Sequence, residues 1–144
     1  MPQVYKMFAS INMLSQEHKR NLLFLVGCLG TRSLLAYAAK YVDKSKLKIM
    51  GYIALVPALI WLYMYFIKPR TTGPEVFGGT IWWNDWRLVH AMIYILFSVY
   101  AIKGEDFAYI PLVVDVFIGF IAFSMNYAHK NIGNNVNNYG NLEI

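Results

Sequence analysis

Two formal charges stand inside long apolar stretches of this 144-residue chain, Arg32 in the first and Asp115 in the last. A charge in hydrocarbon is costly, so it is normally paired or functional. Each lies about seven residues, or roughly 10 Å at the helical rise per residue, from the same end of its stretch. We therefore predict a buried Arg32–Asp115 ion pair that fixes helix packing. Transport or proton relay is the alternative, but no chain of further carboxylates continues a path from this pair.

Two histidines could carry a different chemistry. His90 opens the third apolar stretch and His129 follows the fourth, so an antiparallel hairpin would bring both to one membrane face, where a facing pair could ligate haem iron. Against this, histidine is common at interfaces, and only His18 remains to form a second pair for electron transfer across the membrane. The single cysteine, Cys28, excludes an intramolecular disulfide and a thiolate metal cluster. We predict no cofactor and no metal.

The most individual motif is a tryptophan-rich run that leads into the third apolar stretch. Tryptophans beside a cation are typical of a helix at the boundary between headgroups and hydrocarbon. Asn84 or Asp85 is expected to cap the helix that follows. Tryptophan and arginine also dominate the energetics of protein interfaces, so the same run is a candidate docking surface, and both interpretations can hold. The predicted docking residues are Trp82, Trp83, Asn84, Asp85, Trp86, Arg87 and His90.

The composition decides the class of protein that must position these residues. The chain is 58% hydrophobic and only 15% charged, and its mean hydropathy is +0.39. These values exclude an ordinary soluble domain. The net charge of +5 comes from dispersed lysines and arginines, which anionic lipids explain without nucleic acid. No selectivity-filter, zinc-protease, nucleophile-elbow or phosphate-loop motif occurs, so we predict neither an enzyme nor a small-molecule substrate.

The hydropathy pattern predicts an all-α, polytopic membrane protein with a single membrane domain over residues 1–144. Four transmembrane helices are expected in an up-down bundle, over residues 21–39, 49–67, 86–102 and 108–127. Residues 1–20 show the spacing of an amphipathic helix, which would lie on the membrane surface or pack on a partner. Residues 128–144 form an Asn-rich tail that reads as irregular or extended.

Four spans return both termini to one side, which we call side A. The long connection over residues 71–87 lies on the same side, and side B holds the two short connections, the second with a turn at Gly104. Basic residues flank both sides, so the positive-inside rule leaves the orientation open.

Four stretches carry a resemblance to a known group of proteins. They are Gly30–Leu35 (GTRSLL), Phe77–Asn84 (FGGTIWWN), Arg87–His90 (RLVH) and Pro111–Asp115 (PLVVD). Together they resemble small membrane proteins of large double-stranded DNA viruses of algae and amoebae, over about residues 27–125. The resemblance implies a virion protein of the inner membrane beneath an icosahedral capsid, namely a membrane-embedded minor capsid protein. It implies the lipid bilayer and other minor capsid or membrane proteins as partners, and it supplies no active site.

The sequence is compatible with two functions. The first is structural, a protein that anchors the viral inner membrane to minor capsid proteins through side A. The alternative is a small viral membrane channel or transporter, with Arg32, Asp115 and a helix kinked at Pro57 along its path. A pore needs polar residues at several depths, and the third span offers only Tyr94, Ser98 and Tyr100.

Overall fold

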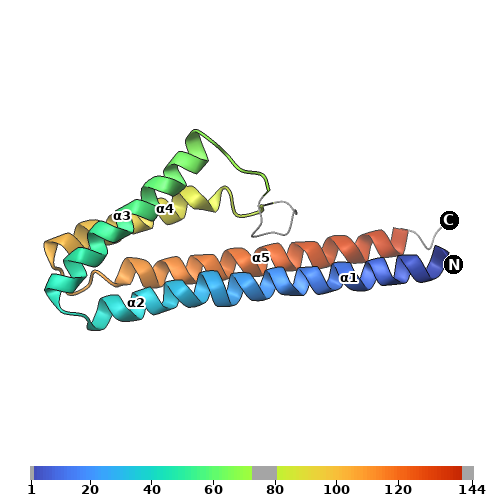
Figure 1. Ribbon diagram of the computed structural model, residues 1–144, viewed down its shortest axis with the longest axis horizontal. Helices are drawn as coiled ribbons and strands as arrows, with labels where there is room; N and C mark the ends of the chain where they lie inside the picture. The colour runs from blue at the N-terminus through green and yellow to red at the C-terminus, as the bar shows by residue number, and fades with distance from the viewer. Residues whose placement is uncertain (1, 73–80, 141–144) are drawn as a thin grey trace.

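The computed structural model describes the backbone of residues 2–72 and 81–140 and the side chains of residues 3–8, 16–72 and 81–136 (Figure 1). This part of the chain is helical, without strands. Four helical stretches are long and apolar enough to cross a membrane: Gln16–Tyr41, Lys44–Phe66, Trp86–Lys103 and Ile110–Val136. The predicted all-α polytopic fold is confirmed. The turn signals at Gly73-Pro74 and Gly78-Gly79 and the last four residues of the tail lie outside the described residues.

The first membrane helix is much longer than its predicted span. It consists of α1 (Pro2–Leu22), the π-helical segment η1 (Leu23–Gly30) and α2 (Thr31–Tyr41), which follow one another without a break (Figure 1). Because α1 continues into the span, residues 2–20 are not a separate helix lying on the membrane surface. The physical reason is local: no glycine or proline interrupts the chain between Pro2 and Gly27. The alternative, that this segment packs on a partner, stays a prediction.

The last helix also runs beyond the bilayer. Helix α5 (Ile110–Gly140) has 31 residues, with Pro111 in its first turn where proline is tolerated. The expectation of an irregular or extended tail is therefore wrong for residues 129–140. Extending an existing helix adds one hydrogen bond for each residue that is fixed, so a tail of poor helix formers can follow a well-formed span.

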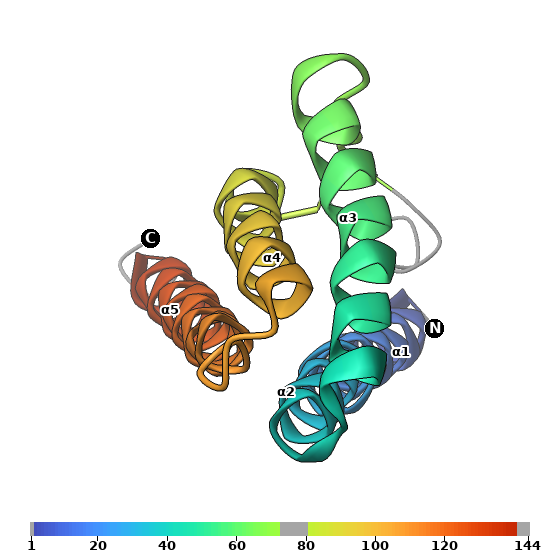
Figure 2. The same cartoon turned by 90° about the vertical axis from the view of Figure 1, so that its left-hand side faces the viewer.

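Helices α3 (Lys44–Phe66) and α4 (Trp86–Lys103) form the most extensive helix–helix contact of the molecule. Small residues let them approach: Ala54, Ala58 and Ala101 are buried between the helices. Helix α3 continues through Pro57. Figure 2, which looks along the long helices, shows α4 lying between α5 and α3.

A tight turn follows α4, as the sequence predicted. Gly104 adopts a left-handed conformation with φ of 76°. Its N–H donates to the carbonyl of Ala101, and the N–H of Glu105 donates to the carbonyl of Tyr100, both over 3.0 Å. This is the Schellman arrangement that satisfies the last carbonyls of a helix. Residues 104–109 then run back beside α4 before α5 begins (Figure 1).

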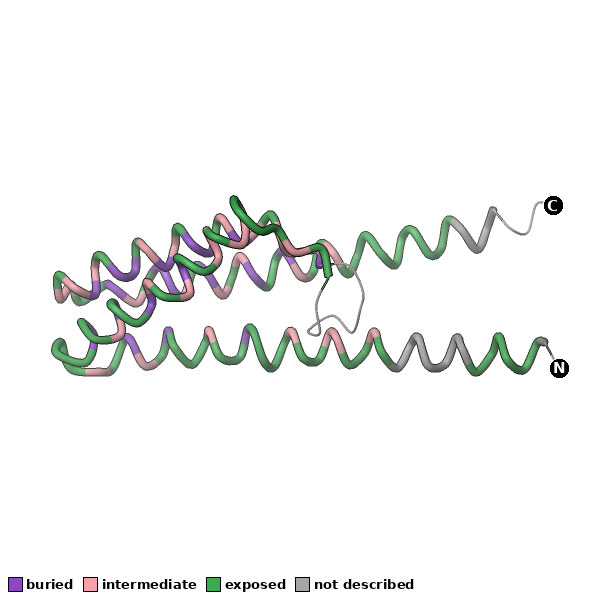
Figure 3. Tube along the Cα trace, turned by 45° about the horizontal axis from the view of Figure 1, so that its top comes forward, coloured by how far each residue is buried: buried purple, intermediate pink, exposed green. Residues whose placement is uncertain are grey.

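Burial is concentrated where the four helices overlap. In Figure 3 the buried residues gather in that half of the molecule, while the ends of the two long helices that carry the termini are exposed where they are described. Large apolar side chains such as Leu34, Ile53 and Phe117 face outward along the overlap region. An apolar exterior around an alanine-rich interior is the pattern of a bundle surrounded by lipid.

Candidate functional site

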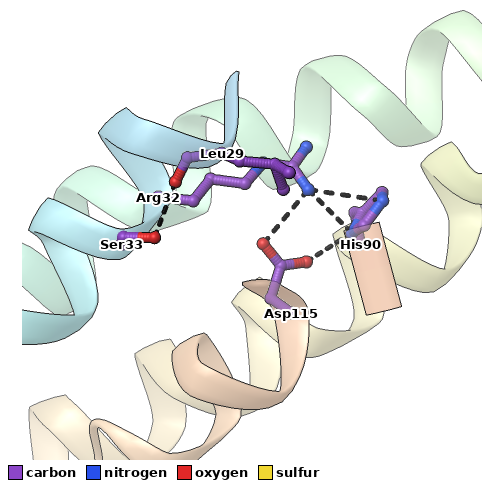
Figure 4. Close-up of polar contacts among 5 residues, drawn as sticks. All are labelled: Leu29, Arg32, Ser33, His90 and Asp115. Atoms are coloured by element: carbon purple, nitrogen blue, oxygen red, sulfur yellow. Dashed lines mark hydrogen bonds and ion pairs between the residues drawn. The ribbon is translucent and has the colours of Figure 1, made fainter. Parts of the chain in front are cut away.

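Arg32 and Asp115 meet in the interior of the bundle. Arg32 is the second residue of α2, and Asp115 lies in the second turn of α5. The Nη1 atom of Arg32 is 3.2 Å from Oδ2 of Asp115, and the Asp115 side chain is completely buried (Figure 4). The structure thus brings together the two charges that the sequence paired, and each charge offsets the cost of burying the other.

His90 of α4 is a third member of this cluster. Its Nδ1 contacts Oδ1 of Asp115, while Nη1 of Arg32 lies 3.0 Å from Nδ1 and 3.3 Å from Nε2 (Figure 4). The sequence predicts this histidine at the membrane boundary instead. A symmetric hairpin would set Asp115 beside the end of α4, whereas its contact with His90 places it opposite the start of that helix. Residues 104–109 run back beside α4 and cause this offset (Figure 1).

The hydrogen-bonding roles in the cluster follow from its chemistry. A guanidinium group only donates and an ionised carboxylate only accepts. The histidine must therefore donate to Asp115 and accept from Arg32. A neutral imidazole with its proton on Nδ1 does both, because Nε2 then offers a lone pair to the guanidinium. In this state the Arg32–His90–Asp115 triad carries no net charge, which suits a membrane interior.

Close helix packing makes the triad possible. A Cβ atom built on Gly119 of α5 would lie 2.9 Å from Cδ2 of Leu29, 3.7 Å from Nη1 of Arg32 and 4.0 Å from Cε1 of His90. The glycine therefore leaves room for α5 beside the first membrane helix. The guanidinium carbon of Arg32 also lies 5.3 Å from the ring centroid of Trp61 on α3, within the range of a cation–π contact. Residues of all four membrane helices thus converge at one level.

The structure separates the predicted docking residues into two groups. Arg87 and His90 are buried, with exposed fractions of 5% and 7%, so they are not part of an open docking surface as predicted. Trp82, Trp83, Asn84 and Trp86 are half-buried, and Asp85 is exposed. Nη1 of Arg87 donates to Oδ1 of Asn84 over 2.8 Å.

Helix α4 begins at Trp86, as expected, but without the predicted side-chain cap. Asp85 precedes the helix in a helical conformation, and its side chain makes no capping hydrogen bond. The Asn84 side-chain oxygen is used by Arg87, and the Asn84 carbonyl accepts from the backbone N–H of Arg87 over 3.2 Å.

Two tryptophans pack against the first helix and α5. The ring of Phe24, in η1, lies 5.4 Å from Trp82, 5.8 Å from Trp83 and 5.3 Å from Phe123 between ring centroids. Such pairs add to the stabilisation from burial. Phe24 and Phe123 carried no signal in the sequence, because each is one aromatic residue among many in an apolar stretch.

The structure does not bring His90 and His129 together. His129 is exposed near the C-terminal end of α5. His90 instead contacts Asp115, which lies near the N-terminal end of the same helix. Among the described residues, no group of three histidine, cysteine or acidic side chains is arranged to hold a metal ion.

No family model, curated protein or solved structure matches this chain. The fold and the four apolar helices define a multi-pass membrane protein. The triad at its centre joins three helices through an ion pair and hydrogen-bonding contacts, while Oδ2 of Asp115 lies 3.2 Å from Arg32 without a hydrogen bond.

Proposed function

We propose that this chain is a structural protein of a viral inner membrane, which anchors the bilayer to minor capsid proteins. The observation that carries the structural part of this proposal is the length of the two outer helices. The viral part is supported by the resemblance of the GTRSLL, FGGTIWWN, RLVH and PLVVD stretches described above.

Both outer helices exceed what a bilayer requires. A span of about 20 residues that starts at Ile110 ends near His129, which leaves roughly 15 Å of α5 beyond the hydrocarbon up to Gly140. At the other terminus, α1 precedes the candidate span at Gln16 by about 20 Å of helix. Both extensions leave the bundle on side A (Figure 1). We call residues 2–15 and 130–140 the projecting helices.

An ion pair sits where the projecting helices leave the bilayer. Oε1 of Glu17 lies 3.8 Å from Nζ of Lys130 and 3.4 Å from Nη2 of Arg20. These side chains are partly exposed, so the pair contributes at most about 1 kcal/mol to stability. The pair links two neighbouring antiparallel helices at a common level.

The projecting helices expose apolar side chains outside the hydrocarbon region. Tyr5 is 81% exposed and Phe8 58%, and on α5 Ile132 and Val136 are each 64% exposed. Apolar surface in this position is typical of a contact site for another protein. A rigid pair of helices with such surface suits an anchor better than a transporter.

The interior of the bundle does not favour the channel alternative. Buried apolar residues follow the triad toward side B: Ala36 on α2, Phe97 on α4 and Leu112 on α5. A conducting path needs polar groups or water along its full length. Ser98 is also buried on that side of the triad, but its hydroxyl donates to the carbonyl of Tyr94 within α4, so the described interior offers no continuous row of polar groups.

Cross-linking mass spectrometry on purified virus particles tests the anchor function. Lys6 and Lys130 on side A should link to a minor capsid protein, while Lys46 and Lys103 on side B serve as controls that should not. Links confined to copies of this chain would overturn the anchor function. Ion flux through liposomes that contain the purified protein would then establish the channel.

A further inference from the structure

An open groove of about 320 Å³ runs along the outside of the bundle between α2 and the start of α5. The two helices are antiparallel (Figure 1), so the groove extends from Lys40 and Tyr109 on side B to Ser33 and Phe117 deeper in the bundle. The helical rise from Ser33 to Lys40 gives it a length of about 10 Å. Its volume falls at the lower end of the range for small-molecule sites, roughly 300–1,000 Å³.

The side-B end of the groove carries a lysine held between two aromatic rings. Nζ of Lys40 lies 5.5 Å from the ring centroid of Tyr41 and 5.5 Å from that of Tyr109. Among the described residues no carboxylate lines the groove, and Lys40 makes no ion pair with them. The two rings offset part of the charge. An ammonium group only donates hydrogen bonds, so the ligand group that it complements is an oxygen acceptor.

Inward from this end the groove is apolar. Ala36 is buried and gives the groove a floor without a bulky side chain, whereas Tyr37 and Phe117 are 65% and 63% exposed and stand at its two rims. The hydroxyl of Ser33 donates to the carbonyl of Leu29 over 2.8 Å, so it offers no donor to a ligand. The groove therefore suits a ligand that is apolar except at one end.

The depth of the groove matches a lipid of the side-B leaflet. Its polar end lies at the membrane boundary, because α2 ends at Tyr41, and its apolar part extends into the hydrocarbon. A phosphate would bring a full negative charge to a groove with one basic side chain, whose charge the rings already offset in part. A single hydroxyl needs no such counter-charge.

The sequence of α2 points to the same class of ligand. Leu35, Tyr37 and Lys40 have the spacing of a short pattern proposed for cholesterol contact. This pattern is frequent by chance, and it carries weight here because Tyr37 and Lys40 line the groove. We propose that the groove binds a sterol, whose hydroxyl oxygen accepts from Nζ of Lys40 and whose ring system lies between α2 and α5. The site does not rest on the anchor function.

Photo-crosslinking tests the site in a membrane. The full chain is reconstituted in phosphatidylcholine vesicles with a trace of cholesterol that carries a diazirine on its ring system, and the label is mapped by peptide mass spectrometry. Label should appear in the peptides that contain Tyr37 and Val113. Unlabelled cholesterol should displace it saturably, and phosphatidylserine at the same mole fraction should not.

A pair of lysine variants tests the polar end. Lys40→Met keeps the apolar stem but removes the donor, and should raise the cholesterol needed for half-displacement about fivefold, the effect of one hydrogen bond. Epicholesterol, whose hydroxyl has the opposite orientation, should compete less well than cholesterol for the unaltered chain but equally well for this variant. Lys48→Met is the control, because Lys48 is exposed on side B outside the groove.

A pair of phenylalanine variants tests the apolar part. Phe117→Ala removes one rim and should weaken cholesterol binding about fivefold, the effect of one lost ring contact. Phe120→Ala removes the same ring from α5 at a position that is 54% exposed and outside the groove, and should leave binding unchanged. Circular dichroism of all four variants checks that each is folded.

Three results would overturn the proposal. Displacement by phosphatidylserine as effective as that by cholesterol would assign the groove to an anionic phospholipid. Labelling that falls as the protein-to-lipid ratio rises would assign it to a second copy of this chain. Equal weakening by Phe117→Ala and Phe120→Ala would show unspecific contact with the surrounding lipid.

Discussion

Gly51 of α3 faces Ala101 of α4 so closely that a Cβ atom built on the glycine would lie 2.9 Å from the Cβ of Ala101. It would also lie 3.1 Å from the carbonyl oxygen of Ser98. Neither atom can rotate away, because one is the first side-chain atom and the other belongs to the backbone. The closest helix pair of the molecule thus depends on a missing side chain.

We expect Gly51→Ala to destabilise the bundle by about 1–3 kcal/mol, the usual cost of an additional carbon in a packed core. The measurement is the midpoint of unfolding in a titration from dodecyl maltoside into sodium dodecyl sulfate, followed by circular dichroism.

Gly133→Ala is the matched control, because a Cβ atom there meets nothing within 4 Å. Gly133 lies inside α5, so alanine should stabilise the helix by up to about 1 kcal/mol through its higher helix propensity. If both glycine variants lose stability equally, the α3–α4 contact is not the reason.

Removal of one partner of the buried ion pair should be far more damaging than removal of both. Arg32→Leu leaves Asp115 with an uncompensated charge and should cost about 3–5 kcal/mol. The double variant Arg32→Leu with Asp115→Leu should recover most of that loss. The same detergent titration measures the coupling energy. Strictly additive losses would show that the pair does not stabilise the bundle.

Two variants separate the contribution of the His90 hydrogen bond to stability from the contribution of the ring's packing. His90→Phe keeps an aromatic ring but removes the donor to Asp115, and should cost about 1–3 kcal/mol. His90→Asn keeps a donor near the position of Nδ1 and should cost less, although it fills less space. A larger loss for asparagine than for phenylalanine would mean that the ring is held for its volume alone.

The topology predicts which residues a membrane-impermeant maleimide can reach. In a Cys28→Ala background, single cysteines at Lys6 and Val136 should react on the same side of sealed vesicles. Cysteines at Lys46 and Lys103 should react only on the opposite side. All four positions have exposed side chains, so burial does not limit labelling. Labelling of Lys6 and Lys46 variants from one side would contradict four spans.

Part of this architecture is encoded locally. Four apolar stretches of sufficient length predict four spans because the cost of burying an unpaired peptide group in lipid leaves a helix as the only form for each stretch. The turn after α4 could be predicted for a similar reason, since Gly104 occupies a left-handed conformation that other residues avoid. The meeting of Arg32 with Asp115 followed from charge, because each needs an opposite partner in hydrocarbon.

Only the tertiary structure decided the remainder. The position of His90 in the triad depends on how far residues 104–109 run back beside α4, and no local preference sets that offset. The continuation of α1 and α5 beyond the bilayer was missed because hydropathy marks where lipid ends but not where a helix ends. The cavity beside the triad likewise forms from residues of separate helices. Helix formation is decided by neighbours along the chain, whereas the depth at which two helices meet is decided by the packing of all four.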